Sequence, residues 1–110
     1  MVDCTKRNFE ESKDHCKKIN CVISSFHSDD DIKRVKDKIK CSAYIGATSD
    51  GNGNWRYVDG SSWWSYSKND GLAGTKETKV AWHTDGKWHD WATGDRRLGV
   101  VCGCEGRNFS

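Results

Sequence analysis

The apolar positions near the start of the chain follow the period of an α-helix. In the segment NFEESKDHCKKIN, Phe9, Cys16 and Ile19 fall on one stripe. Asn8 precedes the stripe as an N-cap, and two glutamates follow in the first turn, where the helix dipole favours negative charge. The pattern predicts a surface helix with one buried face.

A second helical pattern begins after the short β-branched run CVISSF, residues 21–26. Ser28 is placed as the N-cap, three aspartates follow it, and lysines gather toward the far end of the segment. Ile32, Val35 and Ile39 keep the helical period. The pattern predicts a second amphipathic helix whose charged residues form a solvated face.

From residue 41 onward the pattern is that of short strands separated by turns. The segment SAYIGATSDGNGNWRYVDG predicts a strand, a glycine-rich turn and a second strand. The segment KVAWHTDGKWHDW predicts a hairpin about Asp85-Gly86, and RLGVVCGC predicts a final strand. Residues 61–79 are rich in small polar residues with no steady period, which predicts a long loop, and loops of this kind often carry function.

Length and composition narrow the class of protein. A chain of 110 residues predicts a single domain over residues 1–110. Only 35% of its residues are hydrophobic, so the six tryptophans must supply much of the core, and the strand residues Trp55, Trp82 and Trp88 are expected there. The net charge of +2 is too small, and the charges too evenly mixed, to predict nucleic-acid binding. No apolar run approaches the roughly 20 residues of a membrane span.

Six cysteines in so short a chain predict a disulfide framework. Disulfides form in oxidising compartments, so the protein is expected to be secreted or extracellular. A zinc cluster is disfavoured because the sequence lacks a pair of matched Cys-x2-Cys motifs.

Five segments in order, FEESKDHC, CVISSFHSDDDI, YIGATSDGNGNWRYVDGSS, GKWHDW and LGVVC, resemble the C-type lectin-like domain family over about residues 8–102. The resemblance implies an α+β, C-type lectin-like fold. In that fold two helices accompany antiparallel sheets and a long loop region, and disulfides brace the whole.

The resemblance also implies a disulfide between Cys16 and Cys102. The family's second disulfide is absent, because Lys79 and Thr93 occupy its two positions. Four cysteines then remain with three possible connectivities: Cys4, Cys21, Cys41 and Cys104. A helix and strand that run parallel would bring Cys21 to Cys104, whereas neighbouring first and last strands would bring Cys4 to Cys104. The sequence leaves both open.

In the family, sugars bind through a calcium ion held by a tripeptide in the long loop, a later glutamate, and two residues of a Trp-Asn-Asp strand. The positions that match the acidic ligands here are Asp70, Glu77 and Asp90, so the resemblance implies that these three could hold Ca²⁺ through carboxylate oxygens. Together with the neighbouring polar and aromatic residues, the implied carbohydrate site consists of Asp70, Glu77, His89, Asp90 and Trp91. Trp91 is a candidate for stacking on a sugar ring.

Three positions depart from the calcium pattern. Lys68 places a cation and His89 an imidazole where oxygen ligands are expected, and Asn69 replaces the proline of the tripeptide. The same residues could therefore form a calcium-free ligand site or an ordinary solvated loop.

These features predict an extracellular lectin domain that binds glycans or glycoproteins, with Ca²⁺ as a candidate cofactor; an oligomer is compatible with the sequence. The alternative is a calcium-independent module of the same fold that recognises a protein. An enzyme is not expected, because the four histidines have no nucleophile in an evident arrangement and the cysteines are expected to be oxidised.

Overall fold

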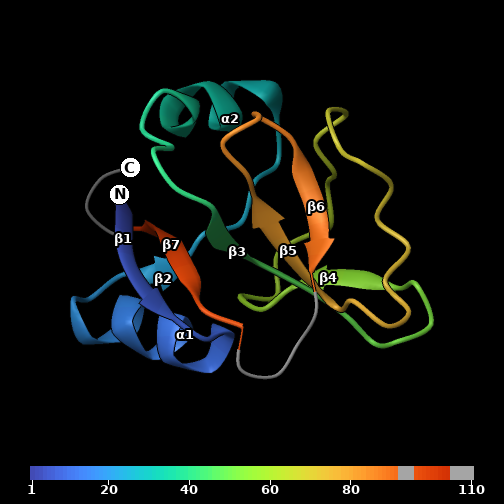
Figure 1. The fold of residues 1–110 in the computed structure, drawn as a ribbon, viewed down its shortest axis with the longest axis horizontal. Helices are drawn as coiled ribbons and strands as arrows, with labels where there is room; N and C mark the ends of the chain where they lie inside the picture. The colour runs from blue at the N-terminus through green and yellow to red at the C-terminus, as the bar shows by residue number, and fades with distance from the viewer. Residues whose placement is uncertain (92–95, 105–110) are drawn as a thin grey trace.

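In the computed structural model, which describes residues 1–91 and 96–104, the order of the elements follows the sequence pattern (Figure 1). The elements are β1 (Val2–Arg7), α1 (Phe9–Lys18), β2 (Val22–Ile23), α2 (Asp29–Lys36), β3 (Ala43–Ser49), β4 (Trp55–Tyr57), β5 (Lys79–Trp82), β6 (Trp88–Trp91) and β7 (Leu98–Gly103). Between β4 and β5 the chain forms no helix or strand beyond an isolated bridge from Asn69 to Trp88. The long loop is therefore confirmed.

Both helices begin at the expected caps. The Asn8 side chain accepts a hydrogen bond from the Glu11 N–H at 2.8 Å, and the Glu11 side chain accepts one in return from the Asn8 N–H at 3.0 Å. Ser28 Oγ accepts from the Asp31 N–H at 3.2 Å and caps α2. Helix α2 ends at Lys36, so Ile39 lies beyond the helix that its spacing suggested, although it still packs against the core. Neither helix of the described chain is long and apolar enough to cross a membrane.

The strands form one mixed sheet in the order β1-β7-β3-β5-β6, with β2 attached to β7 and β4 to β3. Every pairing is antiparallel except that of β3 with β7, in which Ala43 lies opposite Gly99 and Tyr44 opposite Val100. The sheet is therefore mixed, with one parallel pairing that the sequence pattern did not predict. Strand β7 inserts between β1 and β3, and a hydrophobic pattern fixes which residues face inward but not which strand is the neighbour.

Two hydrophobic clusters hold the sheet. The larger one surrounds Trp82 and Trp88, which are 1% and 0% exposed, and the smaller one joins Phe9 of α1 to Tyr44 of β3. The expected core positions of Trp82 and Trp88 are confirmed. Trp55 is half-buried at the margin of the larger cluster, where its indole N–H donates to the Leu72 carbonyl at 3.0 Å.

Three disulfides close the cysteine framework. They join Cys16 to Cys102, Cys21 to Cys104 and Cys4 to Cys41. The first confirms the pairing implied by the family resemblance, and the other two resolve the alternatives in favour of Cys21–Cys104. Of the two positions that lack the family's second disulfide, Lys79 donates to Thr48 Oγ1 at 3.1 Å, and Thr93 lies outside the described residues.

Candidate functional site

The hairpin of β5 and β6 forms as the Asp85-Gly86 signal predicts. Its register places Trp82 opposite Trp88 and continues into the turn, where the His83 N–H donates to the Lys87 carbonyl at 3.0 Å. Gly86 has a φ of +84°, a left-handed conformation that glycine adopts without strain. Because side chains alternate along a strand, the tryptophans face the larger core cluster and the histidines of this hairpin face the other way.

His83 and His89 are therefore diagonal neighbours at the tip of the hairpin, with ring centroids 4.4 Å apart. His89 Nε2 lies 2.9 Å from Asp85 Oδ2, and His89 Nδ1 lies 3.5 Å from Asp70 Oδ2. His83 Nδ1 shares a 2.6 Å hydrogen bond with Ser42 Oγ. We call Ser42, Asp70, His83, Asp85 and His89 the histidine cluster.

The electrostatics of the cluster follow from its burial and its hydrogen bonds. Burial lowers the pKa of His83, and the adjacent His89 lowers it further, so His83 is neutral at neutral pH. The Lys87 backbone N–H and then the His89 ring lower the pKa of Asp85, which keeps this carboxylate ionised. The cluster thus combines an ionised acceptor with imidazole groups whose orientation is fixed.

A hollow of about 280 Å³ opens beside the hairpin tip, between the end of α2 and the long loop. Tyr66 and Trp82, both buried, contribute to its lining, while Lys68 and Asp85 are exposed. His83 lines this hollow and is also a member of the histidine cluster. A polar rim over an aromatic base suits a small polar ligand, and the volume lies near the lower end of the usual range for ligand sites.

Of the residues predicted to bind carbohydrate, the structure brings Asp70 and His89 together. Asp90 shares the face of Trp88 by strand alternation, so its side chain leaves β6 on the side opposite His89. Within residues 1–91 and 96–104, no group of three or more histidine, cysteine, aspartate or glutamate residues is arranged to hold a metal ion. The structure therefore does not gather Asp70, Glu77 and Asp90 into the single carboxylate group that calcium binding would require.

Trp91 packs against its neighbours. Its ring lies 4.7 Å from that of His83, and the Arg96 guanidinium lies over it at 4.5 Å from the ring centroid. A sugar could stack on Trp91 from that side only if Arg96 moved. In the observed arrangement Arg96 covers one face of the Trp91 ring, and Trp91 packs against His83.

The sequence pattern did not single out His83, Asp85 or Ser42 as site residues. For His83 and Asp85 a signal was present in the sequence. A two-residue turn at Asp85-Gly86 fixes the hairpin register and thereby places His83 diagonal to His89. Ser42, the residue before β3, forms its hydrogen bond with His83 across 41 positions of the sequence, and no local pattern reveals such a contact.

No protein-family model and no curated protein matches this sequence. Solved structures match its fold over most of its length. A calcium-independent type II antifreeze protein superposes with a TM-score of 0.78 at 16% identity, over 92% of this chain and 81% of that one. The mouse scavenger receptor C-type lectin carbohydrate-recognition domain gives 0.73 at 22% identity, over 92% and 85%.

A third structure, the cow C-type carbohydrate-recognition domain of CD23 in the presence of an oligosaccharide, gives a TM-score of 0.72 at 21% identity, over 92% of this chain and 82% of that one. Identities this low establish the fold alone. The chain has the C-type lectin-like fold, as the sequence resemblance implied.

Proposed function

We propose that this chain is an extracellular binding module that recognises glycans directly, without a bridging calcium ion, through the histidine cluster and the adjoining hollow. The observation that carries the proposal is the His89 ring, which sits between the carboxylates of Asp70 and Asp85 beside a hollow with an aromatic base. The similar structures include carbohydrate-recognition domains, which supports a binding role over an enzymatic one. The three disulfides support an oxidising, extracellular location.

The chemistry of the cluster suits sugar hydroxyl groups. An ionised carboxylate accepts hydrogen bonds from hydroxyls, and the Asp70 side chain, 67% exposed, offers its oxygens to solvent. The Lys68 ammonium on the rim of the hollow can donate to a hydroxyl oxygen. Neighbouring acceptors and donors of this kind can hold the two oxygens of a vicinal diol.

Direct recognition also follows from the departures from the calcium pattern. His89 stands at a calcium-ligand position of the family, yet both of its nitrogens face carboxylates of this chain. Lys68 adds a positive charge to the long loop itself, and this charge disfavours a bound cation. Of the predicted calcium ligands, Asp70 thus already has His89 as a partner, and Asp90 lies on the other face of the hairpin.

The test is a glycan array probed in chelator with the wild type and four single variants. Asp70→Asn and His89→Gln alter the cluster, whereas Glu77→Gln and Asp90→Asn alter the other two predicted calcium ligands and serve as matched controls. We expect the first pair to weaken binding to the best glycan about tenfold or more, since each removes a hydrogen bond to a charged group. The second pair should keep wild-type affinity.

Two outcomes would contradict direct recognition. If chelator abolishes binding, and Glu77→Gln and Asp90→Asn lose it as completely as Asp70→Asn, glycans bind through calcium at the site implied by the family resemblance. If no glycan binds with or without calcium, the protein-binding alternative replaces the glycan proposal.

A further inference from the structure

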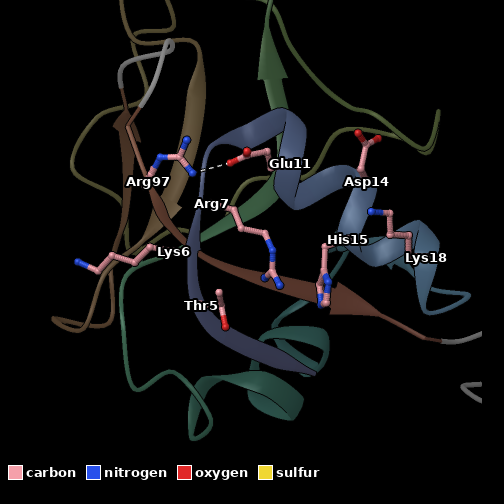
Figure 2. A pocket seen from close by; sticks show the side chains of 8 residues that line it. All are labelled: Thr5, Lys6, Arg7, Glu11, Asp14, His15, Lys18 and Arg97. Atoms are coloured by element: carbon pink, nitrogen blue, oxygen red, sulfur yellow. Dashed lines mark hydrogen bonds and ion pairs between the residues drawn. The ribbon is translucent and has the colours of Figure 1, made fainter.

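A hollow of about 450 Å³ between β1 and α1 is lined mostly by charged side chains (Figure 2). Arg97 Nη1 donates to Glu11 Oε1 at 2.7 Å. Arg7 Nη1 lies 3.5 Å from Asp3 Oδ1, and His15 Nε2 lies 3.0 Å from Asp3 Oδ2. Because these charged groups face one another within the chain, the lining does not call for a ligand. The hollow beside the hairpin tip differs, since polar groups at its base have no partner.

Tyr66 lines the hollow beside the hairpin tip, and its hydroxyl group has no hydrogen-bond partner among the described residues. The other two tyrosines, Tyr44 and Tyr57, each donate to a backbone carbonyl, at 2.7 and 2.6 Å. Tyr66 is only 7% exposed, and a buried tyrosine hydroxyl usually has a partner. The Trp88 indole nitrogen is enclosed without a partner, whereas the Tyr66 hydroxyl oxygen is not enclosed in this way. The Tyr66 hydroxyl is therefore available to a ligand in the hollow.

Trp82 brings a second donor to the base of the same hollow. Its ring centroid lies 6.1 Å from that of Tyr66. The Trp55 indole N–H donates to the Leu72 carbonyl at 3.0 Å, but the Trp82 N–H has no partner among the described residues and is not enclosed. An indole N–H can only donate, and a phenol hydroxyl can donate as well. The base thus suits an acceptor oxygen, such as a carbonyl, which has two lone pairs.

The charges around the hollow favour a neutral acceptor group. Lys36 and Lys68 contribute two positive charges to the lining, and Asp37 and Asp85 contribute two negative charges. Burial lowers the pKa of His83, so this ring is neutral at neutral pH. The described lining therefore carries no excess charge that would attract a carboxylate or a sulfate.

We propose that the hollow beside the hairpin tip binds the acetamido group of an N-acetylated sugar, with the Tyr66 hydroxyl donating to its carbonyl oxygen. This inference rests on the glycan-binding function proposed above and names the class of sugar. An acetamido group is neutral, its carbonyl oxygen accepts hydrogen bonds, and its N–H can donate to the Asp37 carboxylate of the lining. Its methyl group can pack against Ile39. His83 and Asp85 belong to both the hollow and the histidine cluster, so the hydroxyl groups of the same sugar can face the cluster.

The experiment is isothermal titration of the full chain, in chelator, with two matched pairs of sugars. The pairs are chitotriose with cellotriose, and the methyl β-glycoside of N-acetylgalactosamine with that of galactose. Members of a pair differ only in an acetamido group or a hydroxyl at carbon 2. The wild type should bind the acetamido member of at least one pair about tenfold or more tightly, because the other member leaves the donors at the base without their acceptor.

Tyr66→Phe removes only the hydroxyl and should reduce this preference to less than about threefold. The matched control is Tyr44→Phe, which removes a hydroxyl in the smaller hydrophobic cluster and should change the preference less than about twofold. Urea unfolding separates binding from folding. Tyr44→Phe should lower the urea midpoint because it loses a hydrogen bond within the chain, whereas Tyr66→Phe should leave the midpoint unchanged.

Equal affinity for both members of each pair would overturn this inference and leave the glycan proposal standing. A preference that survives in Tyr66→Phe would overturn it as well, as would failure to bind either pair by a protein that does bind glycans on the array. If no glycan binds on the array or in the titrations, the glycan proposal fails, and this inference fails with it.

Discussion

The disulfides should contribute unequally to stability, because two of them close nearly the same loop. Cys16–Cys102 and Cys21–Cys104 both tie the region of α1 and β2 to β7, whereas Cys4–Cys41 closes a loop that neither of the others shortens. We expect replacement of Cys4 and Cys41 by alanine to lower the free energy of unfolding more through chain entropy than replacement of Cys21 and Cys104.

The loop lengths set the magnitudes. Cys4 and Cys41 are 37 residues apart, which corresponds to about 4 kcal/mol in the chain-entropy description. With Cys16–Cys102 intact, the Cys21–Cys104 bond closes a small ring, because Cys21 lies only five positions after Cys16 and Cys104 only two after Cys102. Closing this ring contributes about 2 kcal/mol to the free energy of unfolding. Without Cys16–Cys102 it closes 83 residues, or about 4.5 kcal/mol.

The assay is urea unfolding of the oxidised proteins, with C21A/C104A measured in the wild-type background and again in a C16A/C102A background. The same sulfur atoms are lost in both backgrounds, so the lost packing of buried Cys21 cancels in the comparison. We expect the effect of C21A/C104A to grow by about 2 kcal/mol in the second background. An effect of the same size in both backgrounds would refute the shared-loop reasoning.

Two further predictions concern the hairpin tip and the sheet. Because the pKa of His83 is lowered in the folded state, its contribution to stability is complete above the unfolded value of about 6.5 and declines as the pH falls below that value. The melting temperature should therefore drop between pH 7 and 5, and it should drop less in His83→Gln. Equal drops in the two proteins would exclude His83 as the cause of the pH dependence. Gly46→Ala should lower the free energy of unfolding by about 1–3 kcal/mol in chemical denaturation, since a Cβ there would lie 2.8 Å from the backbone oxygens of Ile23 and Ser24. The control is Gly103→Ala, whose Cβ would come no closer than 3.3 Å to the Ser24 side chain and 3.7 Å to the Val22 carbonyl oxygen, and it should lose less than half as much.

Local signals were enough to predict most of the fold. The N-caps at Asn8 and Ser28 and the turn at Asp85-Gly86 each depend on a few adjacent residues, and all three were predicted from the sequence. The parallel pairing of β3 with β7 and the Cys4–Cys41 bond depend on residues far apart in the chain. Several arrangements of such partners satisfy the same hydrophobic pattern, so the pattern alone could not select among them.

The candidate site was predictable only in part for a similar reason. Family resemblance pointed to Asp70 and His89, which the structure does bring together. It also grouped Asp90 with them, although strand alternation directs neighbouring residues of β6 to opposite faces. The contact of Ser42 with His83 depends on tertiary packing and had no counterpart in the sequence pattern.

The position of β7 between β1 and β3 has a consequence for how the chain reaches its native state. The two strands that flank β7 leave the ribosome long before it does, and until it arrives each presents an unpaired edge toward the other. A nascent or truncated chain that lacks β7 would carry two open edges in place of a closed sheet centre. Such a chain should associate with other chains through its open edges. The yield of folded protein should therefore depend on how quickly and completely the segment that contains Leu98–Gly103 leaves the ribosome.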